Sequence, residues 1–294
     1  MEREVEEYIT YIENHSRKSE NTLLSYRRDL KKLVIFLTDK GLTEWNQVTE
    51  TDLTAYIMQI QREGCAQTTI SRYIVSIKAF FEYLYKNEII SDEAAVNLKA
   101  PRLDKKIPGV ISVEHVVRLL TAPDGDTPKL LRDKAMLELL YATGIKVSEL
   151  VSIRMEDVNL QMGYINCETM AHDRIIPFGK EAKQALIRYL KDGRDKLVKD
   201  NYSEYLFTNV NGGQMSRQGF WKLIKAYAKK AGIEKDITPY TLRHSFAAHM
   251  ISNGADIYAV SEMLGHTDIS ATQVYAVFSN SRLRDVYTKA HPRG

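Results

Sequence analysis

The sequence predicts a mostly helical protein of two domains, the second of which also carries a small antiparallel β-sheet. The chain has 294 residues, which is more than one hydrophobic core usually holds. Apolar side chains recur at steps of three and four along the first hundred residues, the spacing of amphipathic helices. Two strand-like segments, 163–167 and 174–178, flank a polar turn in the second half of the chain.

The first domain, residues 1–97, is expected to be a bundle of four short helices. The segment 21–39 has one apolar face, and Gly41 is a suitable stop signal. The segment 49–52 resembles a capping box at the start of a second helix. The apolar positions of these helices and of a further one are Leu23, Tyr26, Leu30, Leu33, Val34, Leu37, Leu53, Tyr56, Ile57, Ile60, Ile70, Ile74, Ile77, Phe81 and Leu84.

Residues 98–108 differ in composition from what precedes them. They hold two prolines and four cations and show no clear periodicity. This composition indicates a basic linker between two domains, or else a solvated surface loop.

The second domain, residues 109–294, is expected to be mixed. A helix pattern over 130–142 is broken at Thr143 and Gly144. The two strand segments follow, and then a helical stretch over 181–190. Ser216 is a good N-cap for a further helix that extends through Ala231, with Gly232 just past its end.

That last helix is basic, with Arg217, Lys222, Lys225 and Lys229 among its cations and no acidic residue between Ser216 and Gly232. Such a helix is either a solvated face or a DNA-binding one. A net charge of +3 is weak evidence for a nucleic-acid partner, because phosphate contacts depend on local clustering of Lys and Arg.

The composition also excludes several classes of protein. The two cysteines, Cys65 and Cys167, indicate neither a disulfide framework nor a zinc site, which fits a reducing cytoplasm. The first residues are acidic and lack an apolar stretch, so no secretory signal peptide is expected. No apolar run is long enough to span a membrane.

The C-terminal part offers residues suited to phosphate chemistry. Arg243 stands at an expected helix start, and Arg is the natural donor for a two-pronged phosphate contact. His266 follows a glycine turn, and Tyr275 lies nine residues further on. A Tyr hydroxyl can be a nucleophile if nearby cations offset the developing charge. No metal-ligand spacing or phosphate-binding loop is present, so a reaction without metal or nucleotide cofactor is favoured.

Four ordered segments carry a specific resemblance. Residues 142–150, 238–247 and 263–266, followed by Tyr275, resemble the motifs of the tyrosine recombinases, the phage integrase family, and look closest to its Xer subgroup. The resemblance implies a helical core-binding domain and a catalytic domain that close around double-stranded DNA as a C-shaped clamp. It also implies strand cleavage through a 3′-phosphotyrosyl link, a freed 5′-hydroxyl, rejoining by a partner strand, and no cofactor.

The resemblance assigns roles to individual residues. Tyr275 matches the nucleophile, Arg243 the second of two phosphate-clamping arginines, and His266 the histidine that assists the clamp and proton transfer. Glu149 matches an acidic residue that supports the first clamp position. Leu283, Val286 and Tyr287 form one narrow apolar face of a C-terminal tail. In the recombinases this chain resembles, such a tail docks on a neighbouring subunit; the alternative is that it folds back on its own domain.

Three positions depart from the family pattern. Lys146 replaces the first clamping arginine, and Tyr240 replaces the histidine that opens the His-x-x-Arg motif. No lysine occurs between Val147 and Gly179, so the turn lacks the lysine that would serve as general acid, for which His172 or Arg174 are the candidate substitutes. Two hypotheses follow: a recombinase with attenuated catalysis, or an impaired homologue that acts as a sequence-specific DNA-binding protein.

Overall fold

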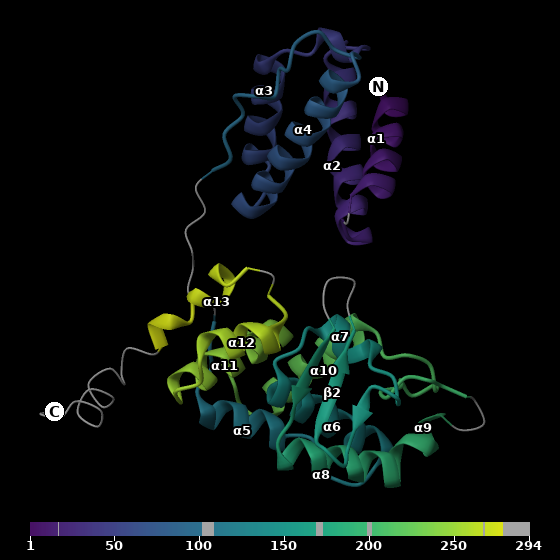
Figure 1. Ribbon diagram of the computed structural model, residues 1–294, viewed down its shortest axis with the longest axis vertical. Helices are drawn as coiled ribbons and strands as arrows, with labels where there is room; N and C mark the ends of the chain where they lie inside the picture. The colour runs from purple at the N-terminus through teal and green to yellow at the C-terminus, as the bar shows by residue number, and fades with distance from the viewer. Residues whose placement is uncertain (17, 102–108, 169–172, 199–201, 267, 279–294) are drawn as a thin grey trace, which may run out of the picture. The chain divides into compact units, whose positions relative to one another are not determined.

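The computed structural model describes residues 1–16, 18–101, 109–168, 173–198, 202–266 and 268–278. The chain divides into two compact units, Met1–Lys105 and Lys106–Gly294, each with its own hydrophobic core. Both units are built mainly of helices, and one small sheet lies in the second (Figure 1). The predicted fold class is therefore confirmed.

The first unit is a helical bundle. Its elements are α1 (Glu2–His15), α2 (Glu20–Asp39), the 3-10 turn η1 (Trp45–Gln47), α3 (Glu50–Arg62) and α4 (Gln67–Lys86). The helices α2, α3 and α4 bury the apolar faces that their spacing predicts. Thr49 and Asp52 form the predicted capping box at the start of α3.

One ion pair between a buried carboxylate and a partly exposed arginine joins two helices of this bundle. Asp29 on α2 is fully buried, and Arg72 on α4 donates to both of its carboxylate oxygens at 2.8 Å. A two-pronged contact of this kind fixes direction as well as distance. It therefore holds α2 and α4 in one register.

The second unit contains the remaining elements. They are α5 (Val113–Thr121), α6 (Pro128–Thr143), α7 (Val147–Ser152), β1 (Val158–Asn159), β2 (Tyr164–Cys167), β3 (Arg174–Pro177), α8 (Lys180–Tyr189), the π turn η2 (Leu190–Arg194), α9 (Asp195–Val198), α10 (Arg217–Lys230), α11 (Pro239–Ser252), α12 (Ile257–Leu264), α13 (Ser270–Gln273) and the 3-10 turn η3 (Ala276–Phe278). The helices predicted around 130–142, 181–190 and 216–231 are present as α6, α8 and α10.

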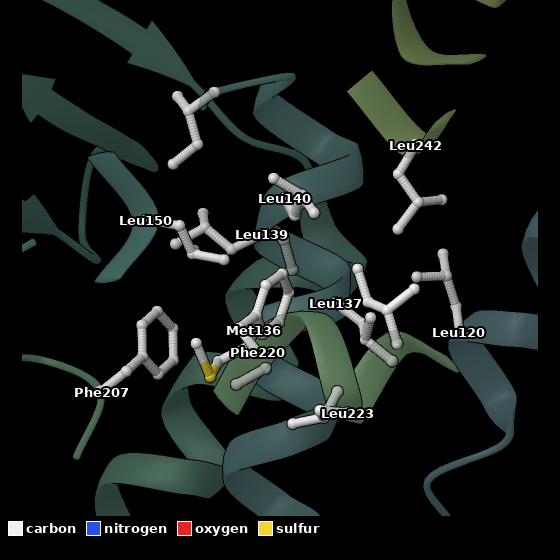
Figure 2. Packing of buried hydrophobic residues seen from close by; sticks show 14 of the residues in the cluster. Leu120, Met136, Leu137, Leu139, Leu140, Leu150, Phe207, Phe220, Leu223 and Leu242 are labelled. Carbon is white, nitrogen blue, oxygen red and sulfur yellow. The ribbon is translucent and has the colours of Figure 1, made fainter. Parts of the chain in front are cut away.

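The helix α6 is the centre of this unit. Thr127 caps its start, and Gly144 ends it in a left-handed conformation. Apolar residues cover most of its circumference, as expected of a helix surrounded by protein. Figure 2 shows Leu139 and Leu140 of α6 among Leu150 of α7, Phe220 of α10 and Leu242 of α11. Because α7 and α11 both pack on α6, their first turns have a common rigid support.

The sheet has the order β1-β2-β3, and both of its pairings are antiparallel. Its register places Ile165 opposite Ile176 and Cys167 opposite Arg174. All four of these residues are buried, as the alternation of side chains along a strand requires. The side chain of Arg174 therefore lies on the same face of the sheet as these core residues.

The last described part of the chain packs on α11. Phe246 of α11, Val260 and Leu264 of α12, and Tyr275 belong to one small cluster of buried residues. Figure 1 shows α11, α12 and α13 grouped together in yellow-green and yellow. Among the described residues, no helix combines the length and the apolar character that crossing a membrane needs.

Candidate active site

Arg243 is held between two helix ends. It is the fifth residue of α11, whose start is capped by Thr238, and it is 5% exposed. Its Nη1 donates to the carbonyl of Gly144 and its Nη2 to the carbonyl of Leu264, both at 2.7 Å. Because a guanidinium has five N–H donors, these bonds leave others for a substrate. Burial lowers the pKa of Arg243, although its charge persists near neutral pH.

His266 lies directly after the left-handed residue Gly265, as the sequence predicts. Its Nε2 is 3.2 Å from Nη2 of Arg243, and its Nδ1 is 2.7 Å from Oγ1 of Thr272. Burial, followed by the charges of Arg243 and Lys146, lowers the pKa of His266 to about 4. The ring is therefore neutral near pH 7, with Nε2 accepting from Arg243 and Nδ1 donating to Thr272.

Tyr275 is 2% exposed, and its hydroxyl contacts Nδ1 of His244. Burial raises the pKa of Tyr275, while the nearby charge of Arg243 lowers it. The hydroxyl is consequently protonated in the DNA-free protein. To attack, it needs an acceptor for its proton and cations for its charge.

Lys146 stands immediately before α7, and its side chain is exposed. Its backbone N–H donates to Oε2 of Glu149 at 2.7 Å. This bond fixes the backbone of Lys146 at the start of α7. The charge of Lys146 contributes to the lowered pKa of His266. Its ammonium therefore acts on the same small region as Arg243.

Arg174 lies at the beginning of β3 and its side chain is 6% exposed. Its Nη2 donates to Oε2 of Glu149 at 2.8 Å, and its Nε donates to the carbonyl of Met263 at 3.1 Å. It therefore joins the start of α7 to the end of α12, and its charge reaches both Arg243 and His266. Since an arginine does not release its proton at ordinary pH, Arg174 supplies charge but cannot replace a lysine as general acid.

Tyr240 lies one helical turn before His244, and its side chain is 66% exposed. The centroids of the two rings are 6.5 Å apart. Sequence reasoning assigned no role to His244. Two signals were available: His244 follows Arg243, and it is four residues from Tyr240, which places both on one face of a helix.

The cations of the predicted DNA-binding helix are not equivalent. Lys222 and Lys229 are exposed, and with Lys225 they follow the three- and four-residue steps of one helical face. Lys225 is only partly exposed, because it pairs with Asp236 and lies 5.0 Å from the centroid of the Trp221 ring. Arg217 is exposed at the first position of α10.

Some predictions concern residues outside the described part of the chain. These are the segment 102–108 of the basic linker, His172 in the turn, and the tail with Leu283, Val286 and Tyr287. Within the described residues, no group of three or more His, Cys, Asp or Glu side chains is arranged to hold a metal ion.

The six residues that the structure brings together are Lys146, Arg174, Arg243, His244, His266 and Tyr275. They combine one lysine, two arginines, two imidazoles of lowered pKa and one phenol. Preorganised cations around a nucleophile stabilise an anionic transition state such as a five-coordinate phosphate. The arrangement is therefore suited to attack of a hydroxyl on a phosphodiester.

Comparison with known proteins gives matches over both units. The phage integrase family matches residues 110–282, and the N-terminal SAM-like domain of phage integrases matches residues 5–88. The tyrosine recombinase XerD of Oceanobacillus iheyensis is 42% identical over 296 residues, which cover 100% of this chain and 99% of the relative.

Solved structures show the same fold. The crystal structure of XerA recombinase is 29% identical, with a TM-score of 0.56 and coverage of 99% of both chains. The XerH site-specific recombinase bound to palindromic difH substrate, a post-cleavage complex, is 18% identical with a TM-score of 0.75. That match covers 98% of this chain and 84% of the other.

Proposed function

Because this chain belongs to the phage integrase family of tyrosine recombinases, we propose that it carries out site-specific recombination of double-stranded DNA. Tyr275 attacks the scissile phosphate, forms a 3′-phosphotyrosyl link and releases a 5′-hydroxyl. The hydroxyl of a partner strand then reverses the step. Since the bond energy is kept in the phosphotyrosine, the reaction needs no cofactor.

The observation that carries this proposal is the position of the Tyr275 hydroxyl. It contacts a neutral imidazole and lies near enough to Arg243 for each group to shift the pKa of the other. Arg243 and His266 supply the clamp on the phosphate, Lys146 supplies a third contact, and Tyr240 lines the approach. The charge of Arg174 adds to the field of these groups.

We assign the two domains and the linker between them separate roles in DNA binding. Residues 1–97 are the core-binding domain, residues 98–108 the basic linker, and residues 109–294 the catalytic domain. In the catalytic domain, Arg217, Lys222, Lys225 and Lys229 contact phosphates. The protein acts in the cytoplasm and assembles on DNA with itself or with a related recombinase, as its similarity to XerD supports.

Catalysis is proposed to be attenuated, and three departures support this. Lys146 keeps a positive charge but lacks the planar fork of an arginine. Tyr240 donates hydrogen bonds but cannot become a cation, and the turn has no lysine. Loss of a general acid alone slows a reaction by about 10²–10⁴-fold. If these losses dominate, the second candidate holds, and the protein binds specific DNA without cutting it.

A nicked suicide duplex distinguishes the two candidates, because cleavage next to the nick releases a short strand and traps the covalent adduct. The recombinase forms an adduct that migrates as a shifted protein band. Tyr275→Phe should abolish that band while leaving the DNA affinity unchanged. An adduct that persists in Tyr275→Phe would show that another residue is the nucleophile, and no adduct in the unaltered protein would favour the second candidate.

A further inference from the structure

His244 is the group in direct contact with the Tyr275 hydroxyl. Its Nδ1 faces Oη of Tyr275, and the two ring centroids are 5.8 Å apart. The same helix carries Tyr240 one turn earlier, where a phenol cannot take up a proton near neutral pH. Among the described residues, His244 is therefore the base that the fold brings to the nucleophile.

We propose that His244 is the general base of the cleavage step, a catalytic residue that accepts the Tyr275 proton at Nδ1. The proposal rests on the recombinase function given above and adds a residue to it. It also explains how Tyr275 can act while Tyr240 stands at the first position of the His-x-x-Arg motif.

The step balances without a further reactant. As Oη of Tyr275 forms its bond to phosphorus, the O–H bond breaks and the proton moves to Nδ1 of His244. The bond from phosphorus to the 5′-oxygen breaks, and that oxygen takes a proton from water or from an acid at the site. In rejoining, the imidazolium of His244 returns its proton to Tyr275 as the tyrosine leaves.

The surroundings of His244 keep it ready to accept a proton. Burial, and next the charge of Arg243, lower the pKa of His244. The other titratable groups that face it are Tyr240 on α11, Tyr275, and His266 after α12. His266 is neutral near pH 7, and Tyr275 is protonated because burial raises its pKa, so Arg243 is the principal charge that acts on His244. The ring is then neutral at physiological pH, as a general base must be.

A second role for the same contact has to be separated from the first. Tyr275 is almost completely buried in the DNA-free protein, so His244 could instead act as a latch that holds the nucleophile away from DNA. The two roles have opposite consequences. Removal of a general base slows adduct formation, whereas removal of a latch accelerates it.

The test is single-turnover adduct formation by the full chain on the nicked duplex, with His244→Gln and His244→Ala. We expect a loss of about 10²–10⁴-fold, the usual contribution of a general base. His249→Gln is the matched control, because His249 is also a partly buried residue of α11 whose Nδ1 lies 2.9 Å from a tyrosine hydroxyl, that of Tyr141. The control should keep its rate, and DNA binding should be equal in all variants.

A duplex with sulfur in place of the scissile 5′-oxygen shows whether His244 acts on the nucleophile or on the leaving group. A thiolate leaves without a proton, so the loss in His244→Gln should persist on this duplex if His244 acts on the nucleophile. A loss that disappears on the sulfur substrate would make His244 the general acid, and a faster or unchanged rate on the oxygen substrate would make it a latch or a bystander. Each of these outcomes overturns the proposal but leaves the recombinase function intact.

A measurement on DNA-free protein does not depend on cleavage. In nitrogen NMR of histidine-labelled protein, Tyr275→Phe should raise the pKa of His244, because the variant has no hydroxyl to donate to the neutral ring. An unchanged pKa would show that the contact is absent in solution and would overturn the inference. If the unaltered protein forms no adduct on either duplex, both the proposed function and the general-base role fail.

Discussion

At the scale of single residues, Lys146 is the substitution whose effect can be measured most directly. A guanidinium at this position would restore the planar fork that can hold two phosphate oxygens, which the ammonium of Lys146 lacks. Loss of a well-placed donor in such a site costs about 10²–10³-fold in rate, and the ammonium of Lys146 recovers part of that. Lys146→Arg should therefore raise the rate of adduct formation by about 10- to 100-fold.

Adding Tyr240→His should give a further, smaller gain, since a histidine there can carry a positive charge beside the phosphate. Tyr275→Phe in each background is the control and should remove the adduct. If the double variant of Lys146 and Tyr240 still forms no adduct, the lysine-free turn, or the loss of cutting altogether, is dominant.

His266 makes the stability of the protein depend on pH. Its pKa is about 4 in the folded protein and about 6.5 in an unfolded chain, so between these values the unfolded state binds more protons. Stability then rises with pH across this window and is lost as the pH falls from about 6.5 to about 4. The free energy of unfolding, measured by denaturant for the unaltered protein and for His266→Gln, should differ less at pH 4.5 than at pH 7. A difference that stays constant would contradict the lowered pKa.

At the scale of secondary-structure elements, the turn after α12 is a tightly constrained position of the site. Gly265 has a φ of +65°, and a Cβ at this residue would lie 2.7 Å from the guanidinium of Arg174. Only a glycine leaves room for Arg174 to join α7, β3 and α12. The sequence indicated a turn here but not this contact, because Arg174 and Gly265 are about ninety residues apart in the chain.

Gly265→Ala should therefore reduce both stability and adduct formation. Gly232→Ala is a matched control, since Gly232 has a φ of +64° and open space where its Cβ would lie. Both variants strain the left-handed backbone by roughly 1–2 kcal/mol, but only Gly265→Ala also displaces Arg174. Thermal unfolding should show the greater loss in Gly265→Ala, and the rate of adduct formation should fall in that variant alone. Equal effects in the two variants would mean that Arg174 moves aside without consequence.

The lysines of α10 differ in how freely they can contact DNA. The sequence identified the helix and its cations, but it did not indicate that Lys225 pairs with Asp236, which follows α10 in the chain. The exposed residues Lys222 and Lys229 should contribute more to DNA affinity than Lys225. Replacing Lys222 and Lys229 with Ala should weaken binding to all sequences and lower the salt slope by about 0.9 for each phosphate that is no longer neutralised. Lys225→Ala serves as the comparison, and a larger effect from it would reverse the ranking.

At the scale of the whole molecule, periodicity predicted the helices and strands well but did not predict the contacts between them. Helices such as α2, α3 and α4 follow from local spacing, because each buries a face that its own residues define. The contact between His244 and Tyr275 joins residues thirty-one apart, and its geometry depends on how α12 and α13 pack on α11. The resemblance to recombinases supplied Arg243, His266 and Tyr275, but it could not supply His244, to which no role had been assigned.

The two separate cores lead to a prediction about the intact chain. The core of the first unit uses residues up to Leu98, and those of the second begin at Ile111 or later. Fragments 1–101 and 109–294 should therefore each fold, with helical circular dichroism and a cooperative thermal transition of their own.

On DNA, the salt slope of the full chain should be close to the sum of the two fragments' slopes, because each neutralised phosphate releases its counterions independently. The affinity of the full chain should exceed that of either fragment by 10²-fold or more, roughly what tethering two binding modules provides. A first fragment that folds but does not bind DNA would place all recognition in the second unit and refute the division of DNA binding proposed for residues 1–97.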